Sequence, residues 1–305
     1  MPSSERAGLV LNPIRTDDPE RLREQVDKAF ADAGRPAPEC RETTPQDAGY
    51  GVARELIAAG RSPLLVAGGD GTIREVCTAA AGTGTPVAIL PLGTGNLLAR
   101  NLDLPLDLDE ALAVALSGVD RRIDLGRIDA DAFPPPGLPA DGFVVMAGMG
   151  FDAAMMADAP ESLKARLGAL AYVVSGIRHL RDDAFGVRLA VDGRDSRHRA
   201  RTVLVGNVGS LQAGIALLPD ARPDDGVLNV AVLAPQRLPD WLRLAWRILR
   251  HDRRRDSQLE RLSGRQIRVR ADRAVPRQLD GDPVAAGREL DVTVQPGAVL
   301  VRGPR

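Results

Sequence analysis

The chain has 305 residues, 44% of them hydrophobic, and its 40 basic and 41 acidic residues leave a formal net charge of −1. This length exceeds what one hydrophobic core normally organises, so two domains of a globular enzyme are expected, and the balanced charge gives no reason to expect a nucleic-acid partner. The N-terminus lacks the pattern of a secretory signal, and no apolar run approaches the ~20 residues of a membrane-spanning helix. A cytoplasmic location is expected, and the two cysteines fit a reducing compartment.

The first 126 residues alternate between strand-like and helix-like segments. In chain order, they are expected to form a strand at 9–12, a helix at 20–33, a helix at 52–59, a strand at 64–69, a helix at 72–81, a strand at 87–92 and a helix at 107–116. Strands that alternate with helices predict a parallel sheet sandwiched between helices.

A glycine-rich turn with an acidic centre follows the expected strand at 64–69. Its glycines, Gly68, Gly69 and Gly71, are expected to let the backbone take positive φ and approach a ligand, and the N–H groups opening the next helix favour an anion. Asp70 would repel a bare phosphate at close range, so it is expected to meet a magnesium ion, a metal-bound water or a hydroxyl. The turn therefore predicts a nucleotide together with a metal ion.

Ordinary turn chemistry is the competing interpretation. Residues 72–75, Thr-Ile-Arg-Glu, form a capping-box pattern that would start the helix with or without a ligand. A second turn, Gly93-Thr-Gly-Asn96, follows the next expected strand. Because crevices in open parallel sheets form outside the carboxyl ends of the strands, two such turns at consecutive strand ends favour one shared ligand.

Beyond residue 127 the pattern changes to short alternating segments. These include 187–191, 203–205, 227–233, 267–270 and 290–294. Such segments predict an antiparallel β-rich second domain, with a helix-compatible insertion at 162–181.

Residues 239–255 form a basic amphipathic pattern, with Trp241, Leu244 and Ile248 on one face and arginines elsewhere. This helix could lie on an anionic membrane surface, or its apolar stripe could simply pack on the β-rich domain.

A series of motifs, in this order and spacing, resembles the catalytic domain of the diacylglycerol kinase and sphingosine kinase superfamily along nearly the whole chain. The motifs are Asn12-Pro13, Gly68-Gly-Asp-Gly-Thr72, Gly93-Thr-Gly-Asn96, Gly148-Met-Gly-Phe-Asp152, Gly206-Asn207, residues 219–228 and Leu279-Asp-Gly-Asp282. Arg74, the segment Ile14-Arg15-Thr16 and Asp282 depart from the family pattern, which commonly has Asn, a Gly or Ser-Gly, and Glu at these places.

The resemblance implies an α/β plus β fold. It predicts an N-terminal parallel-sheet α/β nucleotide-binding domain at 1–126, to which residues 290–305 return, and a C-terminal antiparallel β-sandwich-like lipid-substrate domain at 127–289. The implied activity is ATP- and magnesium-dependent phosphorylation of a primary hydroxyl on diacylglycerol or a related lipid. A peripheral membrane surface is one expected partner, and a homodimer is a further expectation.

The resemblance also implies roles for individual residues. Asp280 would act as general base on the acceptor hydroxyl, with Asp70 and Asp282 in a water and magnesium network. The implied nucleotide cradle consists of Asn12, Thr43, Thr44, Gly68, Gly69, Asp70, Gly71, Thr72, Gly93, Thr94, Gly95 and Asn96.

The same likeness places a second, structural magnesium at Arg222, Asp225 and Val227, two of them through backbone carbonyls. Plain turns are the competing interpretation both there and at residues 280–283. Two other functions stay open, namely a NAD kinase-like enzyme, because that family also uses Gly-Gly-Asp-Gly, and a nucleotide-binding module without catalysis.

Overall fold

The computed structural model describes residues 6–128, 142–150, 184–210, 217–235, 240 and 259–305. The expected helical insertion at 162–181 lies outside the described residues, and so does all of 239–255 except Asp240. The chain divides into two compact units, one made of Met1–Leu125 with Gly297–Arg305 and the other of Gly126–Pro296. The expected domains were 1–126 with 290–305 and 127–289.

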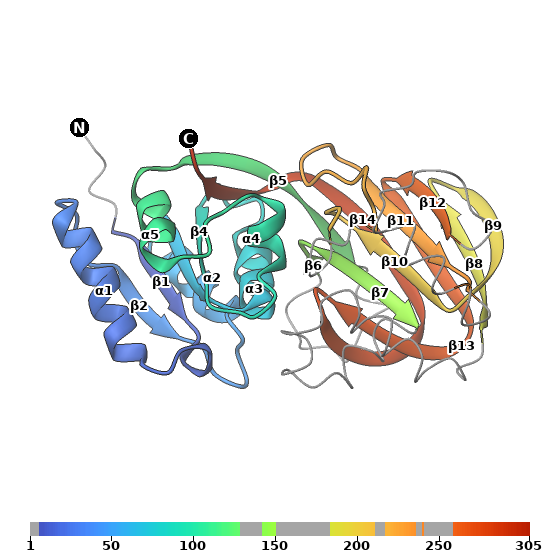
Figure 1. Cartoon of the computed structure of the whole chain (residues 1–305), viewed down its shortest axis with the longest axis horizontal. Helices are drawn as coiled ribbons and strands as arrows, with labels where there is room; N and C mark the ends of the chain where they lie inside the picture. Colours follow the sequence, from blue (N-terminus) through green and yellow to red (C-terminus); the bar gives the residue numbers. More distant parts are fainter. Residues whose placement is uncertain (1–5, 129–141, 151–183, 211–216, 236–239, 241–258) are drawn as a thin grey trace. The chain divides into compact units, whose positions relative to one another are not determined.

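The first unit is a parallel sheet with helices against it (Figure 1). Its strands are β1 (Gly8–Leu11), β2 (Glu39–Glu42), β3 (Leu64–Gly68), β4 (Pro86–Pro91) and the end of β14 (Asp282–Gly303). They pair in the order β2-β1-β3-β4-β14, and every one of these pairs is parallel. All residues of β1 and β3 are buried, as expected for strands that helices cover on both faces.

The helices of this unit follow the strands in alternation. They are the 3₁₀ turn η1 (Pro13–Arg15), α1 (Pro19–Asp32), α2 (Tyr50–Ala58), α3 (Asp70–Ala80), α4 (Leu97–Asn101) and α5 (Leu108–Ser117). Helix α1 packs beside α5, and α2 packs beside α3. Leu22, Val26 and Phe30 of α1 enter one core with Leu9 and Leu65 of the sheet, which explains the helical spacing of apolar residues in that segment.

The second unit is antiparallel throughout its described pairings. Its strands are β6 (Gly142–Phe143), β7 (Met146–Gly150), β8 (Phe185–Val191), β9 (Arg194–Ala200), β10 (Thr202–Gly206), β11 (Leu228–Leu233), β12 (Leu259–Gly264), β13 (Gln266–Leu279) and most of β14, and β5 (Val119–Ile128) leads into it. The order is β12-β11-β10-β7-β13-β14, with β8 also paired to β13. Alternating burial along β8 places Val187, Leu189 and Val191 in the core of this unit. The expected fold class, parallel α/β followed by antiparallel β, is confirmed.

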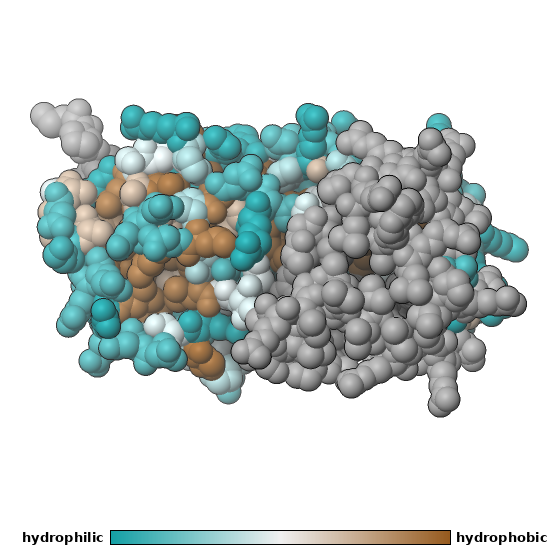
Figure 2. All heavy atoms as spheres, viewed as in Figure 1, coloured by the Kyte–Doolittle hydropathy of each residue, from teal (hydrophilic) through white to brown (hydrophobic). Residues whose placement is uncertain are grey.

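The surface of the first unit is mixed in polarity. Figure 2 shows hydrophilic residues in teal around the margin of its visible face and hydrophobic residues in brown within it. Among the described residues, the exposed large hydrophobic side chains are Ile14, Leu106 and Val119. Burial raises the pKa of the Cys40 thiol, which disfavours its thiolate, and Cys77 is buried in α3.

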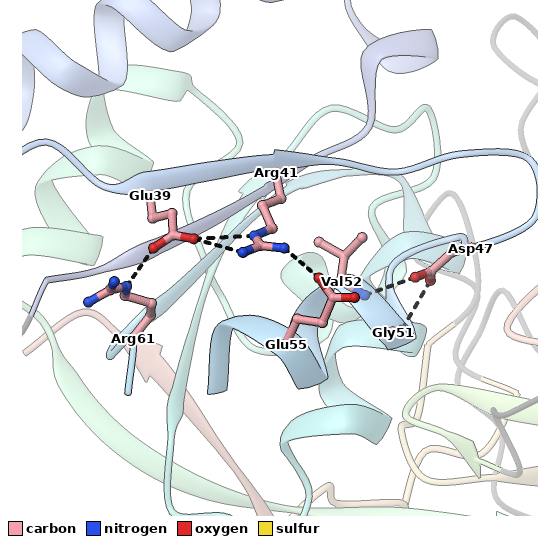
Figure 3. A network of polar contacts seen from close by, with 7 residues as sticks. All are labelled: Glu39, Arg41, Asp47, Gly51, Val52, Glu55 and Arg61. Atoms are coloured by element: carbon pink, nitrogen blue, oxygen red, sulfur yellow. Dashed lines mark hydrogen bonds and ion pairs between the residues drawn. The ribbon is translucent and has the colours of Figure 1, made fainter. Parts of the chain in front are cut away.

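A charged network covers β2, an edge strand of the parallel sheet (Figure 3). Glu39 accepts hydrogen bonds from Arg61 Nε at 2.7 Å and from Arg41 Nε at 3.2 Å, and Arg41 also pairs with Glu55. These charges discourage another strand from pairing with the open edge. The two guanidinium groups lower the pKa of Glu39, chiefly through the Arg61 hydrogen bond.

The lowered pKa predicts a pH-dependent contribution of Glu39 to stability. A carboxyl with a depressed folded-state pKa stabilises the fold above its unfolded pKa, near 4.5, and loses that contribution as the pH falls through the folded value. We expect Glu39→Gln to unfold at lower urea concentration than the parent at pH 7 and at nearly the same concentration at about pH 3. Glu24→Gln, which alters an exposed carboxyl on α1, is the control. A constant difference across this pH range would rule out the ionised pair as its source.

Candidate active site

The loops that follow β1, β2, β3 and β4 leave the sheet at the same edge because these strands are parallel. Asn12 follows β1 directly, and its amide nitrogen donates to Thr72 Oγ1 in α3 at 2.9 Å. Thr43 follows β2, is buried, and its backbone N–H donates to the carbonyl of Leu11 at 2.9 Å. Three of the expected nucleotide residues are thus held together, whereas Thr44 is exposed and turns back toward Asp47.

Helix α3 begins earlier than the sequence pattern indicated. Gly69 is its N-cap and Asp70 its first residue, so Gly71 and Thr72 already lie in the first turn. The expected capping box is wrong, because the Thr72 hydroxyl accepts the Asn12 amide and Glu75 pairs with Arg74 at 3.2 Å. Gly69 has no side chain that could accept a hydrogen bond from the first N–H groups of this helix.

Gly68 and Gly93 are required by crowding and not by positive φ. Gly68, Gly69 and Gly71 are not among the residues with positive φ, so the left-handed backbone expected there is wrong, and Gly93 and Gly95 do not have positive φ either. A Cβ on Gly68 would come within 2.8 Å of Thr72 Cβ, and a Cβ on Gly93 would come within 2.9 Å of Gly69 Cα. Gly68 therefore allows the first turn to close on Thr72, and Gly93 allows the two turns to lie directly against each other.

Asp70 ties the two turns together. Its Oδ1 accepts the backbone N–H of Leu97, the first residue of α4, at 2.6 Å. Asn96, the N-cap of α4, is left-handed with φ of 47°, and its side-chain oxygen accepts the N–H of Gly93 at 2.9 Å instead of capping α4. Asp70 thus supplies from the first turn the cap that the second turn lacks. Between Gly93 and Asn96, Thr94 is exposed and Gly95 is buried.

Asp280 lies in the second unit, at the tip of the β13–β14 hairpin. Leu279 pairs with Asp282, and both loop residues have positive φ, 47° for Asp280 and 92° for Gly281. This is the Asp-Gly chemistry of a two-residue type I′ turn, so the turn expected as the alternative interpretation is present.

The Asp280 carboxylate is buried and points at backbone donors. The side chain is 2% exposed, and it accepts the N–H groups of Val144 at 3.0 Å, Val145 at 2.9 Å and Met146 at 2.7 Å. Buried Asn207 holds the same segment, because its amide donates to the Val144 carbonyl at 3.1 Å. Two of the motifs, Gly206-Asn207 and Leu279-Asp280, thus converge on residues 144–146. Asp282, in contrast, is exposed.

The expected structural magnesium site forms a turn. Asp225 Oδ1 accepts the backbone N–H of Val227 at 3.0 Å, and both Asp225 and Asp224 are exposed. Arg222, in the preceding segment, is exposed as well. Within the described residues, no group of three or more His, Cys, Asp or Glu side chains could hold a metal ion. A magnesium ion that keeps several waters and takes only one or two carboxylates fits Asp70 beside a bound phosphate better than it fits a cage of protein ligands.

Two further residues were not singled out for a role by the sequence analysis. Asp124 in β5 is 1% exposed, and its Oδ1 accepts the N–H of Gly297 at 2.7 Å, where the chain re-enters the first unit. A lone acid between the apolar residues Ile123 and Leu125 was the available signal. Arg15 lies over Gly69, with its Nε 3.4 Å from the position that a Cβ on this glycine would take. In the sequence it stood out only as a departure from the family pattern.

Comparisons with known proteins agree with this arrangement. The family described as diacylglycerol kinase catalytic domain matches residues 6–128, and the family described as YegS C-terminal NAD kinase beta sandwich-like domain matches residues 144–302. A protein named probable lipid kinase YegS-like from Pseudomonas aeruginosa is 34% identical over 257 residues, which cover 83% of this chain and 80% of the relative. A relative with the same printed name from Pseudomonas syringae pv. tomato is 30% identical and covers 98% of this chain and 93% of its own.

The solved structure of a diacylglycerol kinase from Bacillus anthracis str. Sterne has the same fold, with a TM-score of 0.72, 19% identity, and coverage of 98% of this chain and 97% of its own. The two family models and the relatives identify a kinase-type phosphotransferase, and the parallel α/β unit with two glycine turns followed by an antiparallel β unit is consistent with this class. This chain belongs to the YegS and diacylglycerol kinase family of lipid kinases. No described helix is long and apolar enough to cross a membrane.

Proposed function

We propose that this chain transfers the γ-phosphoryl group of ATP, with magnesium, to a primary hydroxyl of diacylglycerol or a closely related lipid. The observation that carries the proposal is the contact between the two glycine turns, which Asp70 locks by accepting the Leu97 N–H. Helix α3 starts in the first of these turns, and helix N-termini favour phosphate groups. Phosphoryl transfer depends mainly on such positioning and on charge stabilisation.

The proposed division of labour follows the two units. The loops after β1, β2, β3 and β4 bind and orient the triphosphate, and the Asn12–Thr72 hydrogen bond fixes the first of them against α3. Magnesium, when bound beside Asp70, would neutralise charge on the transferred group. Asp280 takes the proton of the acceptor hydroxyl in this proposal, and the exposed carboxylate of Asp282 supports it through water.

The proposed acceptor is taken from the family and from the sequence. Which lipid the protein selects depends on the shape of a lipid pocket. Sphingoid bases and other glycerolipids are alternative acceptors. Docking to a membrane surface through residues 239–255 and self-association into a homodimer belong to the proposal on sequence grounds alone, since that segment lies outside the described residues except for Asp240.

The direct test is incubation of the purified protein with γ-labelled ATP, magnesium and a total lipid extract in mixed micelles, followed by mass identification of the labelled product. We expect labelled phosphatidic acid or the phosphate of a related lipid, and no product when EDTA removes divalent cations. A parallel reaction with NAD in place of lipid tests the NAD kinase alternative, and label on NAD would overturn the proposal. ATP binding without any labelled product would instead favour the non-catalytic module.

A further inference from the structure

We propose that Arg15 is a phosphate-binding residue. Its guanidinium would contact a phosphate of the nucleotide that the two glycine turns hold. The inference rests on the proposed function for the identity of the ligand as a nucleotide. It assigns to the loop after β1 a charged contact that comes from this chain's own departure, Ile14-Arg15-Thr16, from the small residues of the family pattern.

The backbone that carries Arg15 is held by hydrogen bonds to Asn12. Asn12 caps the 3₁₀ turn η1 because its side-chain oxygen accepts the Ile14 N–H at 3.2 Å, and the Arg15 N–H donates to the Asn12 carbonyl at 3.1 Å. The same Asn12 side chain donates to Thr72 in the first turn of α3 at 2.9 Å. The turn that presents Arg15 is therefore joined to the helix whose start faces the expected phosphate.

The guanidinium lies against Gly69 in the first glycine turn, where the second turn also comes close. Its Nε is 3.4 Å and its Cζ 3.7 Å from the position that a Cβ on Gly69 would occupy, and the next neighbour of that position is Gly93 Cα at 3.7 Å. The glycine backbone thus leaves room for the guanidinium plane, and the side chain of Arg15 is exposed to solvent and to any ligand.

The charge of Arg15 is available for a ligand. Within the described part of the chain, its side chain makes no ion pair or hydrogen bond. Neighbouring arginines are used by the protein, because Arg74 is buried and pairs with Glu75, and Arg100 Nε donates to the Gly95 carbonyl at 3.0 Å.

The chemistry of the site needs such a cation. Neither glycine turn contains the lysine of a Gly-x-x-x-x-Gly-Lys-Ser/Thr loop, and Asp70 adds a negative charge to the first turn. A guanidinium offers parallel N–H donors that match two oxygens of one phosphate, and it keeps its charge at any relevant pH. Arg15 therefore offsets the Asp70 charge for a phosphate that enters between the turns.

The test compares Arg15→Ala and Arg15→Lys with Arg21→Ala, which removes an exposed arginine from the neighbouring helix α1. Calorimetry measures binding of ATP, pyrophosphate and adenosine to each purified protein. We expect Arg15→Ala to weaken ATP and pyrophosphate binding roughly 10- to 100-fold and to leave adenosine binding unchanged, because a hydrogen bond to a charged group is lost. The affinity of Arg15→Lys for ATP and pyrophosphate should lie between those of the parent and Arg15→Ala, since lysine keeps the charge and loses the planar fork of the guanidinium. Arg21→Ala should bind like the parent.

The outcomes separate this inference from the proposed function. If the parent binds ATP and Arg15→Ala binds ATP and pyrophosphate equally tightly, the role of Arg15 is refuted while the kinase assignment stands. If the parent binds neither compound, both fail together. Unfolding midpoints of the variants should equal that of the parent because the side chain is exposed, and in the lipid kinase assay Arg15→Ala should raise KM for ATP more than it lowers kcat.

Discussion

Asp70→Ala is expected to lower the rate of phosphoryl transfer by at least about 10²-fold, since it removes both a charge at the proposed magnesium position and the hydrogen bond that joins the two glycine turns. The bond from Leu97 N–H to Asp70 Oδ1 is the cap of α4, and loss of a cap costs about 1 kcal/mol of stability. Steady-state kinetics with ATP and a micellar lipid, together with urea unfolding, measure the two effects separately.

Asp70→Asn is the matched control. The amide oxygen of asparagine can still accept the Leu97 N–H, so this variant should keep the unfolding midpoint of the parent and lose only the charge. We expect it to show nearly the same loss of kcat as Asp70→Ala. If Asp70→Asn retains parental activity, the carboxylate serves only to hold α4, and its proposed part in magnesium binding is wrong.

Much of this architecture could be predicted from the sequence because it depends on local patterns. The alternation of strands and helices determined the parallel sheet, and the spacing of Leu22, Val26 and Phe30 determined the buried face of α1. The approach of the two glycine turns could also be expected, because consecutive parallel strands place their carboxyl ends at one edge.

The details that the sequence did not predict depend on contacts between distant residues. Thr72 has the pattern of a capping residue, but α3 begins at Asp70. The Thr72 hydroxyl instead accepts a hydrogen bond from the amide of Asn12, which is far away in sequence. Gly68 was expected to take positive φ, yet what requires glycine there is the side chain of Thr72, and what requires glycine at position 93 is the backbone of Gly69. No property of residues 12–15 by themselves could show that Arg15 would lie over another loop.

Asp280→Asn is expected to lower the free energy of unfolding by about 1–3 kcal/mol, because a buried backbone N–H loses its acceptor. Oδ1 of Asp280 accepts the N–H groups of Val145 and Met146, and Oδ2 accepts that of Val144. Asparagine can provide an oxygen for only one of these positions, so its NH₂ group would face another donor.

The chain contains a matched control for this change in a second Asp-Gly hairpin. Asp192 has φ of 48°, is exposed, and accepts the N–H groups of Arg265 at 2.9 Å and Gln266 at 2.8 Å through the same Oδ1 atom. One amide oxygen can keep both bonds, so Asp192→Asn should change the unfolding free energy by less than about 0.5 kcal/mol. Equal urea midpoints for the two variants would show that the buried hydrogen bond from Val144 to Asp280 contributes nothing to the free energy of unfolding.

The same variant tests whether Asp280 also takes part in catalysis. A carboxylate has about four acceptor positions, and backbone N–H groups use three of them at Asp280. A hydroxyl that gives its proton to Asp280 must therefore approach a carboxylate that already holds residues 144–146 in place. At a temperature where Asp280→Asn is folded, we expect kcat to fall about 10²- to 10⁴-fold, the usual contribution of a general base. A kcat that is unchanged per folded molecule would leave Asp280 with the structural role that its hydrogen bonds define, and the search for the base would move to exposed Asp282.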